Sequence, residues 1–263
     1  MAETAAGAGP LVALVALLAA VAPSSGLAAE KTLLPGIGSE DHRLPVETTD
    51  WPWAAIGRLN SGTGGHCTAT LIAADRVLTA AHCVFNPRTG RMLPSSALHF
   101  LAGFKRGDFA AHATGRAIVT EAAAPAPGPA VLAAIARDWA VVSITPSLPI
   151  RPIPVRTLAL SGPAAGASLL RAGYSQDRAQ MLSVHDGCRI RGRLAEGRVL
   201  LTDCDATRGD SGSPLLLRGD GGEISLIGVT SAVADDDALH GTFVVAADAF
   251  QAALAARAPA SGP

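Results

Sequence analysis

The sequence of 263 residues is poor in aromatic side chains and in charge. Phe, Trp and Tyr make up 4% of it, Asp, Glu, Lys and Arg make up 16%, and the formal net charge at pH 7 is −1. Proteins that bind nucleic acid or an anionic membrane surface through charge carry a basic excess, which is missing here. We therefore expect neither of these partners.

Long apolar runs are missing beyond residue 30. Before it, a single run, 11–21, is too short to cross a bilayer of ~30 Å and is followed by small residues up to Ala29. This pattern is typical of a signal peptide, so we expect residues 1–29 to be removed and the protein to be secreted, extracellular or periplasmic. A membrane anchor or a wrongly assigned start is the alternative, because Glu3 is present and no Lys or Arg precedes the run.

The chain has few cysteines, and their number, four, is even. None of the four cysteines forms the Cys-x-x-Cys spacing that zinc and redox sites use, and no metal or cofactor is expected. In an exported chain an even set favours disulfides. Three pairings are possible, and the sequence offers two equal separations, Cys67 to Cys83 and Cys188 to Cys204. Each such loop would stabilise the fold by ~3 kcal/mol if unstrained.

Long helical stripes are also absent, and short apolar runs broken by Gly and Pro take their place. In the first half of the chain these runs are 53–59, 68–72, 76–79, 98–102, 117–119 and 139–144. In the second half they are 168–172, 181–184, 188–192, 199–203, 213–217, 224–230 and 242–246. Many short strands separated by turn residues predict an all-β barrel or sandwich.

A proline-dense span, 145–154, separates the two sets of strands. Each proline removes a donor from a strand ladder, so this span predicts a connector between two lobes. The tail, 246–257, has no proline and places Phe250 and Leu254 on one face, which predicts a short C-terminal helix. The predicted boundaries are a lead segment 30–45, an N-terminal barrel 46–145, a linker 146–165, a C-terminal barrel 166–247 and a terminal helix 248–257.

Three motifs carry side chains that suit one chemistry. TRGDSGSPLL places Ser211 between two glycines, LTAAHC contains His82, and RDWAVV sets Asp138 at the entrance to an apolar run. Gly, Asp, Ser and Pro are also ordinary turn residues, so the serine motif alone decides nothing. A nucleophilic serine needs an imidazole to take its proton and a buried carboxylate to orient that imidazole, and the chain contains both types.

Each of these residues has a plainer alternative. Asp75, Asp108 and Asp203 also border apolar runs, so the choice of Asp138 depends on strand position and chain order. A histidine outside such a context is usually structural or at the surface. This interpretation applies to His42, His66, His99, His112, His185 and His240.

In the order His, Asp, Ser, the motifs resemble the trypsin/chymotrypsin-like serine endopeptidases. DSGSP, GYSQDR at 173–178 and EDHRLPV at 40–46 are similar to the bacterial branch that includes glutamyl endopeptidases. The resemblance covers residue 40 to the end and implies a peptidase domain, 46–263, of two six-stranded antiparallel barrels with the active site in the cleft between them. It implies His82 as general base, Asp138 as orienting acid and Ser211 as nucleophile, with polypeptides as substrates. We expect a monomer.

The same motif implies an oxyanion hole and raises a question about its aspartate. A glycine tolerates unusual dihedrals, so the amides of Gly209 and Ser211 can converge on a developing oxyanion. The chain lacks the IVGG-like segment whose freed amine in the trypsins pairs with the aspartate beside the nucleophile, here Asp210. A buried, unpaired carboxylate costs several kcal/mol, so we expect a cation, a processed N-terminus or backbone donors beside it.

The resemblance also implies a primary pocket. Its base lies six residues before the nucleophile, at Asp205, where a carboxylate would pair with substrate Lys or Arg. Glutamyl-specific relatives have a histidine at the position of Thr230, so a glutamate preference is not expected. The walls would be Ser231, Ala232, Val233 and Gly241, with the backbone of 231–233 pairing with an extended peptide.

Two rival functions remain open. A non-catalytic peptide-binding protein on the same scaffold would usually have lost a triad member or the oxyanion glycine, and neither loss is visible. An esterase or lipase of the α/β-hydrolase type expects Gly-x-Ser-x-Gly and the order Ser, Asp, His, whereas the order here is His, Asp, Ser. The sequence therefore favours a secreted serine endopeptidase that works through an acyl-enzyme.

Overall fold

A computed structural model describes residues 1–2, 34–123, 131–158, 168–236 and 239–255, and the side chains of 235–240 are left aside. The predicted signal peptide lies outside these residues except for its first two. The elements below all belong to one unit, Leu33–Pro263.

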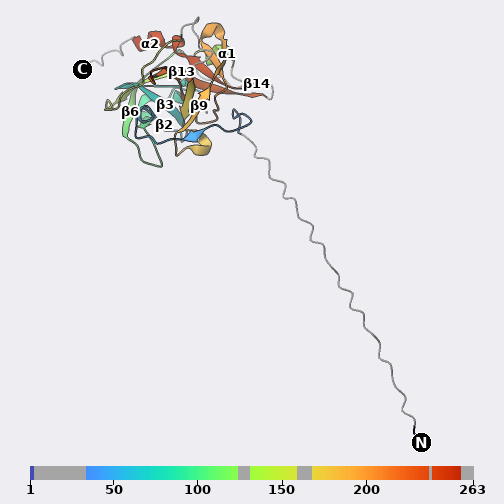
Figure 1. The fold of residues 1–263 in the computed structure, drawn as a ribbon. Helices are drawn as coiled ribbons and strands as arrows, with labels where there is room; N and C mark the ends of the chain where they lie inside the picture. Colours follow the sequence, from blue (N-terminus) through green and yellow to red (C-terminus); the bar gives the residue numbers. More distant parts are fainter. Residues whose placement is uncertain (3–33, 124–130, 159–167, 237–238, 256–263) are drawn as a thin grey trace. The chain divides into compact units, whose positions relative to one another are not determined.

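The first lobe is a closed barrel of six antiparallel strands in the order β2-β3-β4-β7-β6-β5 (Figure 1). Side chains of β5 alternate between the barrel interior and the outer face, as a pleated strand requires. The strands are β2 (Ile56–Ser61), β3 (His66–Ala73), β4 (Arg76–Thr79), β5 (Leu98–Ala102), β6 (Ala111–Thr120) and β7 (Ala140–Thr145).

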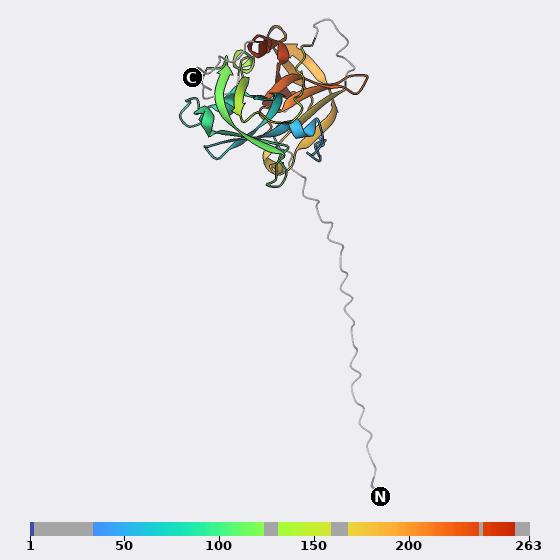
Figure 2. The ribbon, with the colours of Figure 1, turned by 90° about the vertical axis from the view of Figure 1, so that its left-hand side faces the viewer.

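The second lobe is a curled antiparallel sheet of eight strands in the order β1-β9-β8-β12-β13-β14-β11-β10. Its members are β1 (Leu44–Pro45), β8 (Leu169–Gly173), β9 (Ser183–Cys188), β10 (Ile190–Leu194), β11 (Val199–Thr202), β12 (Pro214–Arg218), β13 (Ile224–Asp236) and β14 (Leu239–Ala246). The all-β, two-lobed architecture is confirmed, although this sheet has eight strands and not the expected six. The lead segment supplies one of them, β1, which pairs with β9. In Figures 1 and 2 the teal and green strands of the first lobe lie beside the orange and red strands of the second.

Helices are short. They are η1 (Trp53–Ala55), η2 (Ala81–Val84), η3 (Ser95–Ala97), α1 (Leu132–Ile135), η4 (Gln176–Arg178), η5 (Ala195–Gly197), η6 (Ala247–Ala249) and α2 (Gln251–Ala255). The expected C-terminal helix is therefore present as α2. Across the described residues, no helix combines the length and the apolar composition that a membrane crossing requires.

The C-terminal segment packs against the first barrel. The rings of Trp139 and Phe250 are both buried, with centroids 5.9 Å apart, and the Arg76 guanidinium donates to the carbonyl of Leu254 at 3.0 Å. Burying one such large apolar side chain stabilises a fold by about 1.5–3 kcal/mol. The segment from Phe250 to Leu254 is thereby anchored to the first barrel.

The described part of the predicted linker crosses from one lobe to the other. The amide of Ile153 donates to the carbonyl of Leu71 in β3 at 2.9 Å, and the amide of Arg156 donates to the carbonyl of Leu226 in β13 at 2.9 Å. This path suits the connector expected from its prolines, while the domain boundaries remain predictions.

Candidate active site

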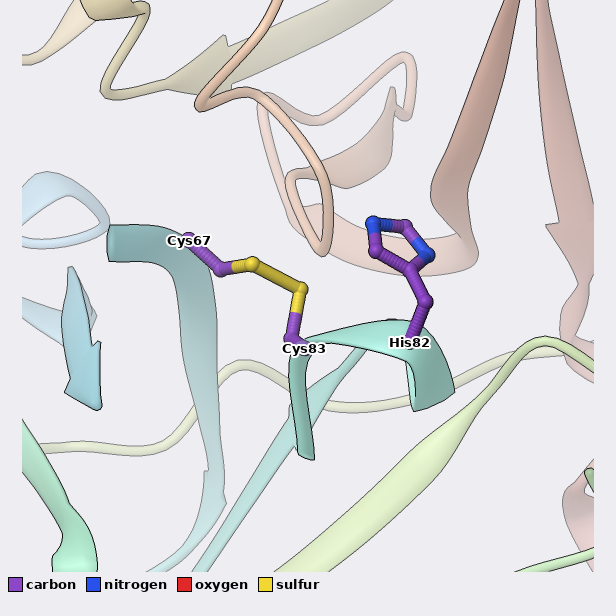
Figure 3. A group of neighbouring side chains, drawn as sticks. All are labelled: Cys67, His82 and Cys83. Atoms are coloured by element: carbon purple, nitrogen blue, oxygen red, sulfur yellow. A yellow bond between two sulfur atoms is a disulfide. The ribbon is translucent and has the colours of Figure 1, made fainter. Parts of the chain in front are cut away.

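His82 lies in η2, immediately after β4. The small residues Ala80 and Ala81 are fully buried and hold this turn against the barrel. A disulfide from Cys67 in β3 to Cys83, with Cα atoms 6.1 Å apart, fixes the same turn. Figure 3 shows the His82 imidazole on the side of the η2 ribbon that also carries the disulfide. Because both sulfur atoms are bonded to each other, this close group of two cysteines and a histidine is not a metal-ligand set.

The second disulfide joins Cys188, at the end of β9, to Cys204, with Cα atoms 5.0 Å apart. Both bridges span 16 residues, so the pairing suggested by equal separations is confirmed.

Asp138 lies beside His82 because of strand register. β4 and β7 pair antiparallel with Thr79 opposite Ala140, and the same register continued by two residues sets Asp138 near η2. One carboxylate oxygen accepts the backbone amide of His82 at 2.8 Å, and the other lies 2.8 Å from His82 Nδ1. A proton on Nδ1 satisfies this hydrogen bond and leaves Nε2 as the lone-pair nitrogen.

Ser231 completes the surroundings of Asp138. Its hydroxyl donates to the same carboxylate oxygen that His82 contacts, at 2.5 Å, from a position 93 residues away in sequence. Ser231 was expected in a pocket wall, and its contact with Asp138 was not anticipated. No sequence signal predicts this contact, because it depends on β13 of the second lobe reaching Asp138, which lies between α1 and β7.

The charges of this pair shift both pKa values. Burial alone would lower the pKa of His82, but the negative charge of Asp138 and its hydrogen bond outweigh burial and raise the pKa. Burial would raise the pKa of Asp138, but the charge of His82 and the hydrogen bonds from His82 and Ser231 lower it. The pair therefore favours an ionised carboxylate beside a basic imidazole.

The loop of Ser211 meets the His82 turn through Gly212. A Cβ at Gly212 would lie 2.1 Å from the carbonyl oxygen of Thr68 and 3.0 Å from the amide nitrogen of Ala80. Only glycine fits this contact, and Gly212 also has a positive φ of 82°. Gly212, which follows Ser211, is thus packed against Ala80, two residues before His82.

The two amides expected to form an oxyanion hole have no hydrogen-bond acceptor among the described residues. Gly209 has a φ of 90°, which favours glycine. Within the part of the chain that the structure describes, neither the Gly209 amide nor the Ser211 amide donates a hydrogen bond to another residue. Both remain available to an oxygen of a ligand.

Asp210 is fully buried and fully partnered. Arg171, equally buried in β8, donates from Nη1 to one carboxylate oxygen at 2.5 Å. The Ser175 hydroxyl and the Thr207 amide donate to the other oxygen at 2.7 and 2.9 Å. The expectation of a cation and backbone donors beside this aspartate is confirmed, and no chain terminus takes part in these contacts.

Asp205 is turned toward the lead segment. The amides of Gly38 and His42 donate to its two carboxylate oxygens at 3.0 and 2.8 Å, and His42 Nδ1 lies 3.1 Å away. The carboxylate is almost completely buried, with 4% of the side chain exposed. This geometry does not favour pairing with substrate Lys or Arg, and the basic preference stays a prediction.

His185 joins Asp205 and His42 in one cluster. The rings of His42 and His185 stack with centroids 4.9 Å apart, and His185 Nδ1 accepts the Asp205 amide at 2.8 Å. Burial lowers the pKa of His185 more than the charge of Asp205 raises it. Because the Nδ1 lone pair is already used, these three residues form a hydrogen-bonded cluster and not a ready set of metal ligands.

The other expected wall residues lie on two neighbouring strands. Ala232 and Val233 are partly exposed on β13, the strand that also carries Ser231. Gly241 lies opposite Ala234 on β14, where a Cβ would be 2.7 Å from the carbonyl oxygen of Thr202. The lead segment reaches this wall, since a Cβ at Gly36 would lie 2.6 Å from a methyl carbon of Val233.

Comparisons with known proteins agree with this fold. No curated protein matches the sequence. Among solved structures, one of a Glu endopeptidase in complex with MPD is similar, with a TM-score of 0.66 and 20% sequence identity over 84% of this chain and 99% of that chain. At this identity the likeness shows the fold alone. The Trypsin family model matches residues 43–254, and the chain therefore belongs to the trypsin family.

Proposed function

We propose that this protein is a secreted serine endopeptidase that cleaves peptide bonds through His82, Asp138 and Ser211. The observation that carries the proposal is the pair of hydrogen bonds, both 2.8 Å, that hold His82 on Asp138 while the Ser211 loop packs against the same turn. The His82 side chain keeps 35% of its surface exposed, so its ring is accessible to a substrate.

The proposed reaction has two stages. His82 Nε2 takes the hydroxyl proton of Ser211 as Ser211 Oγ attacks the carbonyl carbon of the scissile bond. The carbon–nitrogen bond then breaks, and His82 returns the proton to the leaving amine. Water attacks the resulting ester on Ser211, again with His82 as base and then acid, and releases the new carboxyl group. Asp138 stays ionised throughout and stabilises the imidazolium.

The amides of Gly209 and Ser211 would receive the oxyanion in both stages. Neither amide has an acceptor in the part of the protein that the structure describes, which supports this role. Losing one such donor typically costs ~2.7–4 kcal/mol of transition-state stabilisation. The chemistry requires no metal or cofactor.

Secretion, substrate class and assembly belong to the same proposal. Two disulfides suit an oxidising compartment outside the cytosol. Polypeptides are the proposed substrates, and the protein is proposed to act as a monomer. Ser231, Ala232, Val233 and Gly241 remain the proposed pocket wall with Asp205 behind it, and a peptide library would define the preferred residue before the cut.

A peptide-binding protein without catalysis is the rival, and labelling separates the two. A fluorophosphonate probe should label the secreted protein rapidly and should not label the Ser211→Ala variant, because only an activated serine reacts. Ser213→Ala is a matched control, since Ser213 is buried two residues away and its hydroxyl has no partner among the described residues. Absence of labelling in the folded wild-type protein would favour the binding function.

A further inference from the structure

Thr68 is a fully buried residue of β3 that touches the Ser211 loop from the opposite lobe. We infer that Thr68 is a positioning residue that holds the Gly209 and Ser211 amides in the orientation an oxyanion requires. This inference depends on the function proposed above and names a residue that acts through the loop and not on the substrate.

The backbone of Thr68 is available because β3 extends past the end of β4. Pairing between these strands reaches only Thr70 opposite Leu78. The N–H and C=O of one strand residue point to the same side, so at Thr68 they meet no β4 backbone partner. The Thr68 amide instead donates to the carbonyl of Ser211 at 2.8 Å, and its carbonyl accepts the hydroxyl of Thr79 at 2.8 Å.

The side chain of Thr68 holds a second point of the loop. Its hydroxyl donates to the carbonyl of Gly209 at 3.2 Å and accepts the amide of Tyr174 at 2.9 Å. A hydroxyl has one donor and two acceptor positions, so both bonds can exist together. Ser175, the residue after Tyr174, donates to Asp210, so the support continues behind the loop.

With these contacts, the backbone carbonyls of four consecutive residues, 208–211, each accept a hydrogen bond. The carbonyl of Arg208 accepts the Gln176 amide at 2.6 Å, and that of Asp210 accepts the Ser213 amide at 2.9 Å. Thr68 holds the remaining two, those of Gly209 and Ser211. Because each peptide group is planar, a held carbonyl also fixes the direction of the amide in the same plane.

The plane that the Thr68 hydroxyl holds lies between the two oxyanion donors. The Gly209 amide belongs to the peptide plane before it, and the Ser211 amide belongs to the plane after it. Gly209 is a glycine with a φ of 90°, and its backbone can rotate more freely than that of a residue with a side chain, so rotation of this middle plane would separate the two donors. The middle plane is held at its N–H, because the Asp210 amide donates to the carbonyl of Thr207 at 3.1 Å, and at its C=O by the Thr68 hydroxyl. Thr68 therefore supplies the restraint from outside the loop that helps to keep the two donors convergent.

The simpler alternative is that Thr68 joins the two lobes without affecting catalysis. Kinetic measurements distinguish this alternative from a positioning role. Thr68→Val keeps the shape and the backbone bond to Ser211 but loses both hydroxyl bonds. We expect kcat for a peptide substrate to fall about 10- to 100-fold, less than the roughly 100- to 1,000-fold loss of a whole donor, with KM within about 2-fold. The affinity of a peptide aldehyde should fall by a similar factor, because its hemiacetal oxygen occupies the same two amides.

Two further variants make the test specific. Thr68→Ser retains the hydroxyl and should recover kcat to within about 3-fold. Thr70→Val removes a buried hydroxyl two residues along the same strand that has no partner among the described residues, and it should leave kcat unchanged. Thr68→Ala replaces Thr68→Val if the latter does not fold, which near-UV circular dichroism would reveal.

The inference is overturned if folded Thr68→Val or Thr68→Ala keeps the wild-type kcat and aldehyde affinity, or if Thr68→Ser is as impaired as they are. A rise in KM with constant kcat would also overturn it, because that result indicates a loss of substrate binding alone. If the wild-type protein neither cleaves peptides nor reacts with a fluorophosphonate, the proposed function fails first. The two failures are therefore distinguishable.

Discussion

The molecule contains two carboxylates, those of half-buried Asp138 and buried Asp205, that each hold a histidine in nearly the same way. Asp138 accepts both the backbone amide and Nδ1 of His82, and Asp205 accepts both the backbone amide and Nδ1 of His42. The neighbours differ. The Ser211 loop packs against the turn of His82, whereas His42 stacks on His185 and lies in the lead segment.

The difference shows that a histidine on an aspartate is not by itself a catalytic pair. What distinguishes His82 is the segment that its turn meets, and this meeting depends on contacts among Gly212, Thr68 and Ala80. The Asp205 pair instead anchors residues 38–42 to the second lobe. The same local chemistry thus suits the proposed catalysis at one site and attaches a segment at the other.

The largest expected contrast between the two pairs comes from removing each imidazole. His82→Ala should lower kcat by about 10⁶-fold, because the nucleophile loses its base. His42→Ala should change kcat by less than about 10-fold, because His42 has no place in the proposed reaction. Steady-state kinetics on one peptide substrate measures both, and a comparable loss in the two variants would break the comparison.

The next contrast exchanges each carboxylate for an amide. Asp138→Asn should lower kcat by about 10⁴-fold, because the amide favours the wrong imidazole tautomer. Asp205→Asn should act mainly on stability, since the amides of Gly38 and His42 lose a charged acceptor, a bond of about 1.5–3 kcal/mol. Kinetics and thermal unfolding of both variants test this division, which an unchanged kcat in Asp138→Asn would refute.

The pH dependence of kcat/KM should reflect the titration of the His82–Asp138 pair and should not depend on His42. His82 must be neutral to act as base, and its pKa is raised, so kcat/KM should rise with pH along a limb that lies above the ordinary histidine value of about 6.5. His42→Ala should show the same limb. If the rising limb of kcat/KM moved to another pH in His42→Ala, the titrating group would belong to the Asp205 pair and the prediction would be wrong.

The same shifts set the sign of their contributions to stability. The raised pKa of His82 contributes stability that is complete below about pH 6.5 and is lost as pH rises through the folded-state value. The lowered pKa of Asp138 contributes stability that is present above about pH 3.9 and is lost as pH falls through the folded-state value. Urea unfolding across this pH range, compared between wild type and Asp138→Asn, measures both.

The smallest expected change in kcat comes from Ser231. Its hydroxyl contacts Asp138, and the Asp205 pair has no corresponding serine contact among the described residues. Ser231→Ala removes one hydrogen bond to the carboxylate, worth about 1.5–3 kcal/mol, and we expect kcat to fall roughly 10-fold. Ser225→Ala, a buried serine earlier on β13, is the control and should keep the wild-type rate. Equal rates in the wild type and Ser231→Ala would mean that His82 alone orients Asp138.

Local patterns predicted several elements well. The runs 76–79 and 98–102 coincide with β4 and β5, because turn residues on both sides of a short apolar stretch leave little choice of where the strand begins and ends. The run 53–59 was partly wrong, since Trp53–Ala55 forms a 3-10 turn and the strand starts at Ile56. The runs 224–230 and 242–246 fell short of β13 and β14, because these strands pair with each other well beyond their apolar parts.

The sequence by itself determined the residue types and their order: a histidine before a cysteine, an aspartate before an apolar strand, a serine between glycines, and four cysteines at two equal separations. These are short-range patterns, readable within a few residues. The tertiary structure alone decided that Arg171 neutralises Asp210, that Ser231 and Thr68 support the site, and that Asp205 faces the lead segment. Such contacts join residues as many as 167 positions apart, and only the tertiary packing brings their donors and acceptors within 3.2 Å.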